Sequence, residues 1–200
     1  VSDEQVDPDW MMRFIDDAKD TSNDEVQELW AQLLAGEVAK PGKFSRRSIG
    51  IIKNLDSTDA SLFVSVCKHC FTIDNSIEIL IPSYKDEYAT LIGINFNKLA
   101  HLESIGLINF AAVSGEYEIT YKLTGEFNVI NFKNTDGVLS LFVEEDSTGS
   151  EDFVVPLGVI DLTWSGSEIA SLIDKSHDDN YIACILAYLK KMGSIAEFVR

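Results

Sequence analysis

Cysteine, proline and histidine are scarce in this chain, with three, four and three residues among 200. A small, odd number of cysteines cannot supply the disulfide framework of a secreted domain, so a reducing, cytoplasmic setting is expected. The first residues are acidic and lack the basic and apolar regions of a secretory signal. Because the chain starts with valine, we also expect further sequence upstream of it.

Positive charge is equally scarce, with 16 lysines and arginines against 33 acidic residues and a net charge of −17. Such a surface repels nucleic acid and anionic lipid, so any nucleic-acid contact requires a local basic patch. Long apolar runs are missing too, since no stretch approaches the roughly 18 residues that span a bilayer. We therefore expect no membrane segment.

What the chain does contain is 46% hydrophobic and 10% aromatic residues, which is typical of a folded globular protein. The first 70 residues predict four helices joined by short turns. Asp7 before Pro8 caps the first, and its apolar side includes Trp10, Phe14 and Ile15. The expected caps of the next three are Ser22, Ser45, and Ser57 or Thr58.

Strands are the main predicted elements after residue 76, and one turn sequence is typical of a β-hairpin. The segments 107–113 and 117–123 alternate around Ser114-Gly115, which indicates a β-hairpin after a helix over 95–104. This order is that of a winged helix. The other expected elements are strands over 77–81, 127–132, 138–144, 153–162 and 195–199, an acidic loop over 145–152, and helices over 165–173, capped by Ser165, and 181–192, ended by Gly193.

These patterns predict an α+β fold, with a four-helix N-terminal part packed on a winged-helix-like unit and a small αβ C-terminal unit. The expected boundaries are 1–72, 73–145 and 153–200, and the three parts together fit one compact domain.

No catalytic or metal-binding group is expected. Cys67-Lys68-His69-Cys70 resembles half of a zinc site, but a structural zinc needs four ligands and Cys184 is the only other cysteine. Both cysteines are therefore interpreted as core residues of one helix. The paired carboxylates have no histidine at a useful spacing and fit a solvated surface. No phosphate loop, calcium loop or nucleophile elbow occurs, so we predict no cofactor and no enzymatic activity.

The densest basic stretch, residues 40–53, is the best candidate site. It holds Lys40, Lys43, Arg46, Arg47 and Lys53, and the two arginines follow a predicted helix cap, where free N–H groups favour an anion. Two interpretations stay open. The stretch either binds an anionic partner or neutralises the acidic first helices, whose residues 1–30 hold ten acids against two basic residues.

The winged-helix pattern carries little basic charge. Its predicted recognition helix, NFNKLAHLES, has one lysine, and the wing SGEY has neither lysine nor arginine. These charges argue against DNA recognition and favour a protein-binding winged helix.

Residues 7–63 resemble a bacterial conserved domain of unknown function. The pattern is D-x-x-W ending at Trp10, then ELWAxLLAGE with Trp30 and Leu33, a Pro-Gly-x-Phe-Ser break and L-x-x-x-D-A. The ELWAxLL block is similar to that of the Abi-alpha family, linked to abortive infection. LTWSGSEIASLI and YIACILAYLKKMGSIAEF are similar to later parts of the same family pattern. The resemblance implies a cytoplasmic bacterial protein, with a connection to phage defence and no catalytic residues to carry over.

The leading hypothesis is therefore a non-enzymatic protein-interaction or sensor module. Its expected partner is another protein or the upstream part of the same protein, and self-association into a homo-oligomer stays open. Lys43, Arg46, Arg47 and Lys53 are the expected partner-binding or anion-binding residues, and Trp10, Trp30 and Leu33 are structural. The alternative is a nucleic-acid-binding regulator that uses the Lys40–Lys53 stretch.

Overall fold

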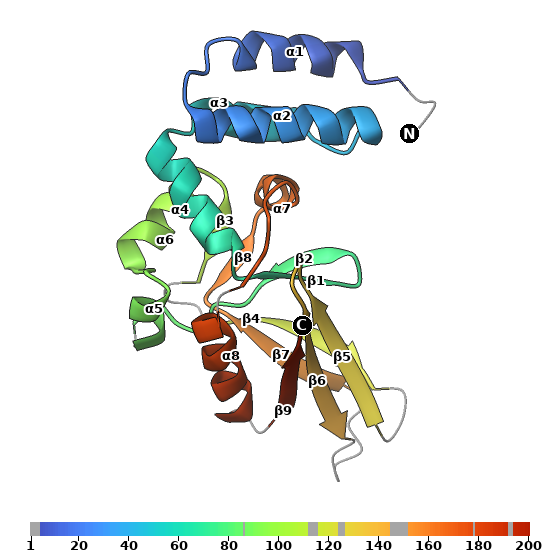
Figure 1. The fold of residues 1–200 in the computed structure, drawn as a ribbon, viewed down its shortest axis with the longest axis vertical. Coiled ribbons are helices and arrows are strands. Elements are labelled where there is room, and N and C mark those ends of the chain that lie inside the picture. Colours follow the sequence, from blue (N-terminus) through green and yellow to red (C-terminus); the bar gives the residue numbers. More distant parts are fainter. Residues whose placement is uncertain are drawn as a thin grey trace. The chain divides into compact units, whose positions relative to one another are not determined.

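The computed structural model describes residues 5–85, 87–111, 116–123, 127–144, 152–177, 179–191 and 194–200. They form a mixed α+β fold, as predicted, with helices first and strands from Cys70 onwards (Figure 1). The chain divides into two units, each drawn from three segments. Unit 1 comprises residues 1–67, 100–109 and 162–174; unit 2 comprises residues 68–99, 110–161 and 175–200.

Unit 1 contains the four predicted N-terminal helices, α1 (Pro8–Ala18), α2 (Asp24–Ala39), α3 (Arg46–Asn54) and α4 (Ser57–Cys67). Two predicted caps are confirmed. The Asp7 carboxylate accepts from the Asp9 N–H at 2.8 Å, and Ser45 Oγ lies 3.3 Å from the Ser48 nitrogen. Asn23 rather than Ser22 caps α2, through a 3.0 Å bond from the Val26 N–H. The two side chains cap helices about equally well, so sequence alone does not choose between neighbours.

Aromatic packing joins α1 to α2. Trp10 stacks on Phe14 with ring centroids 5.5 Å apart, and Phe14 meets the edge of Trp30 at 5.3 Å. Leu33 is fully buried, as expected for a structural residue. Ile15, which the sequence placed on the same apolar side of α1 as Trp10 and Phe14, is exposed.

Two later segments complete unit 1. They contribute the end of α6 (Phe96–Ser104), the start of β3 (Ile108–Phe110) and α7 (Trp164–Ala170). Thr163, and not the predicted Ser165, caps α7, and its hydroxyl donates to the Gly106 carbonyl at 2.7 Å. Gly166 lets α7 approach this segment, because a Cβ there would lie 1.9 Å from the Leu107 oxygen. These long-range contacts explain why the units differ from the predicted boundaries 1–72, 73–145 and 153–200.

Unit 2 is built on an antiparallel five-stranded sheet in the order β2-β1-β5-β6-β9. The strands are β1 (Cys70–Ile73), β2 (Ser76–Ile79), β5 (Phe127–Lys133), β6 (Val138–Glu144) and β9 (Ile195–Val199). β4 (Tyr117–Lys122) pairs with β7 (Asp152–Gly158), and β3 pairs with β8 (Ile160–Leu162). The helices are α5 (Glu87–Leu91) and α8 (Asp179–Lys191).

The core of unit 2 covers one face of this sheet. Strand residues of alternating position, such as Ile130, Phe132, Leu139 and Leu141, are buried together with the apolar side of α8. Side chains in a strand point alternately to the two faces. The residues between them, beginning with Val129, therefore form an outer face.

The predicted winged-helix hairpin is not confirmed. The two predicted hairpin strands do not pair with each other: β3 pairs with β8, and β4 pairs with β7. The β7 residues Val155 and Leu157 lie in the core. This pairing between distant segments cannot be inferred from the local Ser-Gly turn signal. The Ser114-Gly115 turn, residues 145–151 of the acidic loop and Gly193 lie outside the described residues.

The first strand of the sheet was not predicted, since Cys70 was assigned to the fourth helix. Cys67 ends α4 and Cys70 begins β1, and both are buried without a disulfide. Their interpretation as core residues is confirmed, whereas their shared helix is wrong. Across the described ranges, no helix combines the length and apolarity needed to cross a membrane.

Candidate functional site

Two of the predicted basic site residues are engaged in ion pairs with α1 and its cap. The Arg46 guanidinium lies 3.3 Å from carboxylate oxygens of both Asp7 and Asp9, and Lys53 Nζ lies 2.6 Å from Asp17 Oδ1. Lys43 lies over the ring of its neighbour Phe44, and Arg47 is exposed. These contacts favour the interpretation that the basic stretch neutralises the acidic first helix.

Asp17 is the buried member of this set. Besides Lys53 it contacts Arg13, whose Nε lies 2.5 Å from Asp17 Oδ2. The hydrogen bond from Lys53 and, after it, the charge of Arg13 lower the pKa of Asp17 against the opposing effect of burial. Asp17 is therefore ionised at neutral pH, and its ion pairs stabilise the docking of α1 on α3.

We expect Asp17→Asn to lower the melting temperature at neutral pH, and the difference from the wild type to narrow in acid. The pKa of Asp17 is lowered from 3.8, so its contribution is complete above that pH and disappears as pH falls through the lowered pKa. Thermal unfolding followed across this pH range measures the difference. Asp16→Asn, on the exposed side of α1, is the control; a difference that does not change with pH would contradict the assignment.

The family-pattern residues of α2 hold the Pro-Gly break in place. The Glu37 carboxylate accepts from the backbone N–H groups of Gly42 at 2.6 Å and Phe44 at 2.9 Å. Trp10 Nε1 donates to the Phe44 carbonyl at 2.9 Å. Gly36 leaves room for the Phe44 ring, which would lie 2.6 Å from a Cβ at that position. These residues are structural.

The segment around α7 contacts the start of α3. Glu168 of α7 accepts hydrogen bonds from the Ser45 N–H, the Ser45 hydroxyl and the Ser48 hydroxyl, at 2.8, 2.9 and 2.5 Å. Its other oxygen accepts from the exposed Trp164 indole at 2.6 Å. The segment LTWSGSEIASLI therefore serves the packing of unit 1.

Among the residues that the structure describes, unit 2 carries a group of three exposed apolar side chains on neighbouring strands. Val129 pairs with Phe142, and Phe142 pairs with Ile195, so the three lie in one row across β5, β6 and β9. Their exposed fractions are 52%, 36% and 65%. We call Val129, Phe142 and Ile195 the apolar row. It crosses three hydrogen-bonded strands on the outer face of the sheet.

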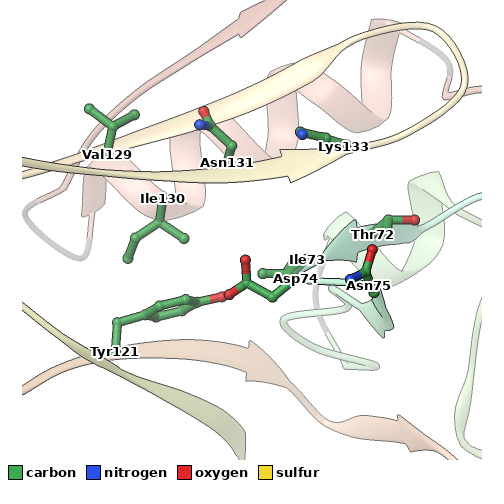
Figure 2. A pocket seen from close by; sticks show the side chains of 9 residues that line it. All are labelled: Thr72, Ile73, Asp74, Asn75, Tyr121, Val129, Ile130, Asn131 and Lys133. Carbon is green, nitrogen blue, oxygen red and sulfur yellow. The ribbon is translucent and has the colours of Figure 1, made fainter.

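A polar pocket of about 430 Å³ adjoins the row at Val129 (Figure 2). It lies where β1 separates from β5, since among the described residues the two strands pair at Thr72 and Lys133 alone. β1 then turns back through Asp74 and Asn75, both with positive φ, as a two-residue type I′ hairpin turn requires. The lining residues are Thr72, Ile73, Asp74, Asn75, Tyr121, Val129, Ile130, Asn131 and Lys133.

Tyr121 and Asp74 define the inner wall of the pocket. Figure 2 shows the phenol and the carboxylate pointing toward one another. The Tyr121 hydroxyl is buried and accepts or donates no hydrogen bond within the described part of the chain. Burial, and after it the charges of Asp74 and Glu78, raise the pKa of Tyr121 to about 12. The phenol is therefore protonated at neutral pH.

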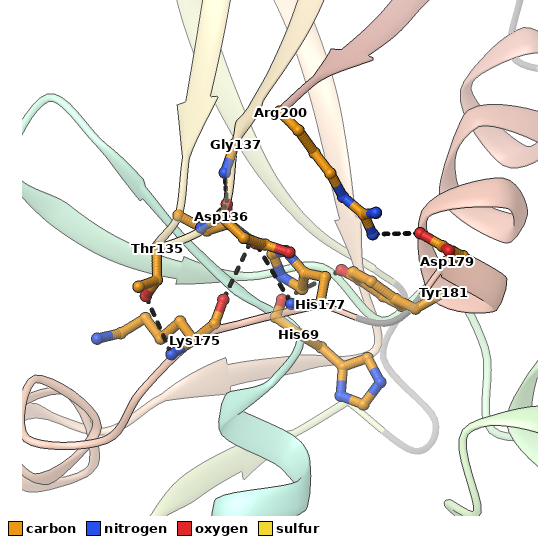
Figure 3. A network of polar contacts seen from close by, with 10 residues as sticks. His69, Thr135, Asp136, Gly137, Lys175, His177, Asp179, Tyr181 and Arg200 are labelled. Atoms are coloured by element: carbon orange, nitrogen blue, oxygen red, sulfur yellow. Dashed lines mark hydrogen bonds and ion pairs between the residues drawn. The ribbon is translucent and has the colours of Figure 1, made fainter.

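A second polar cluster in unit 2 is structural (Figure 3). Asn134 Oδ1 accepts from the Gly137 N–H at 2.8 Å in the β5–β6 turn, while its amide nitrogen donates to the Lys175 carbonyl at 3.0 Å and contacts His177. The His177 ring packs on Phe71 and Tyr181, with centroids 4.4 and 4.9 Å away. This cluster fixes the turn to the segment before α8.

The protein therefore has a mixed α+β fold, and its unit 2 carries two neighbouring features: the apolar row on the outer sheet face and the polar pocket beside Val129. The family model "Protein of unknown function (DUF2806)" matches residues 1–186, and the chain belongs to this family. This confirms the resemblance to a conserved domain of unknown function, and no link to the Abi-alpha family is found. No curated protein and no solved structure matches the chain.

Metal binding has no support in the described segments, where no three His, Cys, Asp or Glu side chains gather as ligands would. The expectation of a chain without metal or cofactor stays a prediction.

Proposed function

We propose that the chain is a non-enzymatic protein-interaction module whose contact surface is the outer face of β5, β6 and β9. The apolar row is the observation that carries the proposal. Contiguous exposed apolar side chains mark sites of protein association, whereas single ones are ordinary. Trp164 is more exposed but stands in unit 1 with its indole bonded to Glu168.

The occupant that we infer is a different protein rather than a second copy. Each chain carries a net charge of −17, so two copies repel each other. A partner with a basic, partly apolar contact segment is attracted to the same surface. The pocket beside Val129 adds polar groups at the border of the row, as expected for an interface with an apolar centre and a polar rim.

Nucleic-acid binding through residues 40–53 is the weaker candidate. Arg46 and Lys53 are held by Asp7, Asp9 and Asp17, so a phosphate has to compete with existing ion pairs. The basic charges outside these pairs are too few to offset the overall charge. We also propose that the protein acts in the cytoplasm of bacteria in defence against phage. This part of the proposal is supported by the resemblance of the ELWAxLL block alone.

Selection of short random peptides on the immobilised full chain tests the proposal. We expect enrichment of sequences with apolar residues at alternating positions. Phe142→Ser is expected to weaken binding of the enriched peptides at least about tenfold, since an aromatic residue at the centre of an interface contributes most.

Val154→Ser is the matched control, because Val154 is an exposed strand residue on β7, outside the five-stranded sheet. It is expected to bind as the wild type does. Equal binding by Phe142→Ser and the wild type would overturn the proposal. So would a wild-type dimer that becomes monomeric in Phe142→Ser, because the face would then be occupied by a second copy.

A further inference from the structure

We infer that the partner segment adds to the sheet as a short strand beside β5 and places a lysine or arginine side chain between Asp74 and Tyr121. The inference rests on the proposed function and names the chemistry of the partner. Three observations carry it: an interrupted strand pairing, the alternation of side chains along β5, and the charge of the pocket wall.

The interrupted pairing leaves the β5 residues Val129, Ile130 and Asn131 without a β1 partner in the described part of the chain. Along the described residues, β1 meets β5 at Thr72 opposite Lys133 and pairs with it nowhere else. The pocket occupies the place that a longer β1 would fill, next to Val129, Ile130 and Asn131. Open strand edges accept extended segments, which pair through their main chain.

Alternation of side chains then gives the added strand two different neighbourhoods. Side chains that share the face of Val129 extend the apolar row by one strand. Side chains on the other face point, as Ile130 does, toward the Tyr121 side of the pocket (Figure 2). One extended segment can therefore use both surfaces at once.

The inner wall favours a cation. Asp74 supplies a carboxylate, and the buried Tyr121 oxygen can accept a hydrogen bond from a partner group. Glu78 adds negative charge near the phenol. Lys133 borders the pocket at its other end, where β1 pairs with β5. A lysine or arginine of the partner thus has its acceptors at Asp74 and Tyr121, away from Lys133.

Binding of the enriched peptides to four full-length proteins tests the inference: the wild type, Asp74→Asn, Tyr121→Phe and Glu118→Gln. Asparagine tolerates the positive φ of position 74, so the turn is retained. Glu118 is an exposed acid of the same unit and controls for net charge. We expect about a tenfold loss of affinity for Asp74→Asn, a smaller loss for Tyr121→Phe and none for Glu118→Gln.

Altered peptides complete the test. Norleucine in place of the basic residue is expected to lower affinity for the wild type and to abolish the difference between the wild type and Asp74→Asn. Two further peptides carry N-methyl groups on alternate backbone nitrogens, one at the odd and one at the even positions. One of the two is expected not to bind, because an added strand donates hydrogen bonds from every second N–H group.

The outcomes separate the two proposals. Enriched apolar peptides without a basic residue, bound equally by Asp74→Asn, would overturn the inference and leave the proposed function intact. Insensitivity to backbone methylation at both the odd and the even positions would overturn strand addition. If 1,5-diaminopentane alone competed as strongly as the peptide, the pocket would be a small-amine site and the inference would be wrong.

Discussion

Replacing Glu37 with alanine is expected to lower the free energy of unfolding by about 2–4 kcal/mol. Glu37 is 1% exposed, and its carboxylate accepts hydrogen bonds from the N–H groups of Gly42 and Phe44. Hydrogen bonds to a charged group contribute roughly 1.5–3 kcal/mol each, and their loss leaves buried donors without acceptors. The Pro-Gly break then loses its anchor, and with it Phe44, to which Trp10 is bonded.

Urea unfolding followed by tryptophan fluorescence measures this effect directly. All three tryptophans, Trp10, Trp30 and Trp164, lie in unit 1, so the signal reports on the unit that contains Glu37. Glu37→Gln, which keeps one acceptor oxygen, should lose less. Glu28→Ala on the same helix is the control, because Glu28 is exposed and bonds only the Gln32 side chain among the described contacts. A loss for Glu37→Ala no larger than that of Glu28→Ala would contradict the anchoring role.

Replacing Gly158 with alanine is expected to destabilise unit 2 by about 3 kcal/mol or more, through steric overlap and backbone strain. A Cβ at this position would lie 1.9 Å from the Ile81 oxygen, and the φ angle is +110°. Ile81 is held on both sides, since its N–H donates to the Leu157 carbonyl at 3.0 Å and its carbonyl accepts from Val159 at 2.9 Å. The added methyl group is therefore expected to break the hydrogen bonds of Ile81 with Leu157 and Val159.

Gly93→Ala separates strain from overlap. Gly93 also has a positive φ, +69°, but a Cβ there meets nothing within 4 Å. Its expected cost is about 1 kcal/mol, which is the cost of the left-handed conformation alone. Near-ultraviolet circular dichroism during urea unfolding of both variants measures the difference. Similar stabilities for Gly158→Ala and Gly93→Ala would show that the approach of Ile81 is not tight.

Local signals in the sequence predicted most elements, because caps and periodicity act within a few residues. Asp7 and Ser45 are examples, and the strands of the β5–β6 hairpin agree within two residues. Pairings between distant strands were not predictable in this way. The segment before Ser114 is the strand nearest in sequence to β4, yet β4 pairs with β7, whose Val155 and Leu157 are core residues.

The sequence directed attention to the basic stretch and not to the proposed contact surface. The basic stretch was identified as a charged cluster, but periodicity alone could not show that Asp17 of α1 is buried against Lys53. The apolar row was missed because its three residues meet only through the register of three strands. A signal was present: Val129-Ile130 and Phe142-Val143 are adjacent apolar pairs, and one member of each pair must lie on the outer face. Asp74-Asn75, both tolerant of positive φ, likewise indicated the first hairpin.

Hydrogen–deuterium exchange of the full chain, with and without an enriched peptide, tests the central claim most directly. The proposed function predicts slower exchange in β5, β6 and β9, with unit 1 unchanged. An added strand predicts the strongest protection in the stretch of β5 between Val129 and Lys133. Protection confined to α3 and the segment before it, or none in the five-stranded sheet, would contradict the assignment of this face as the interaction surface.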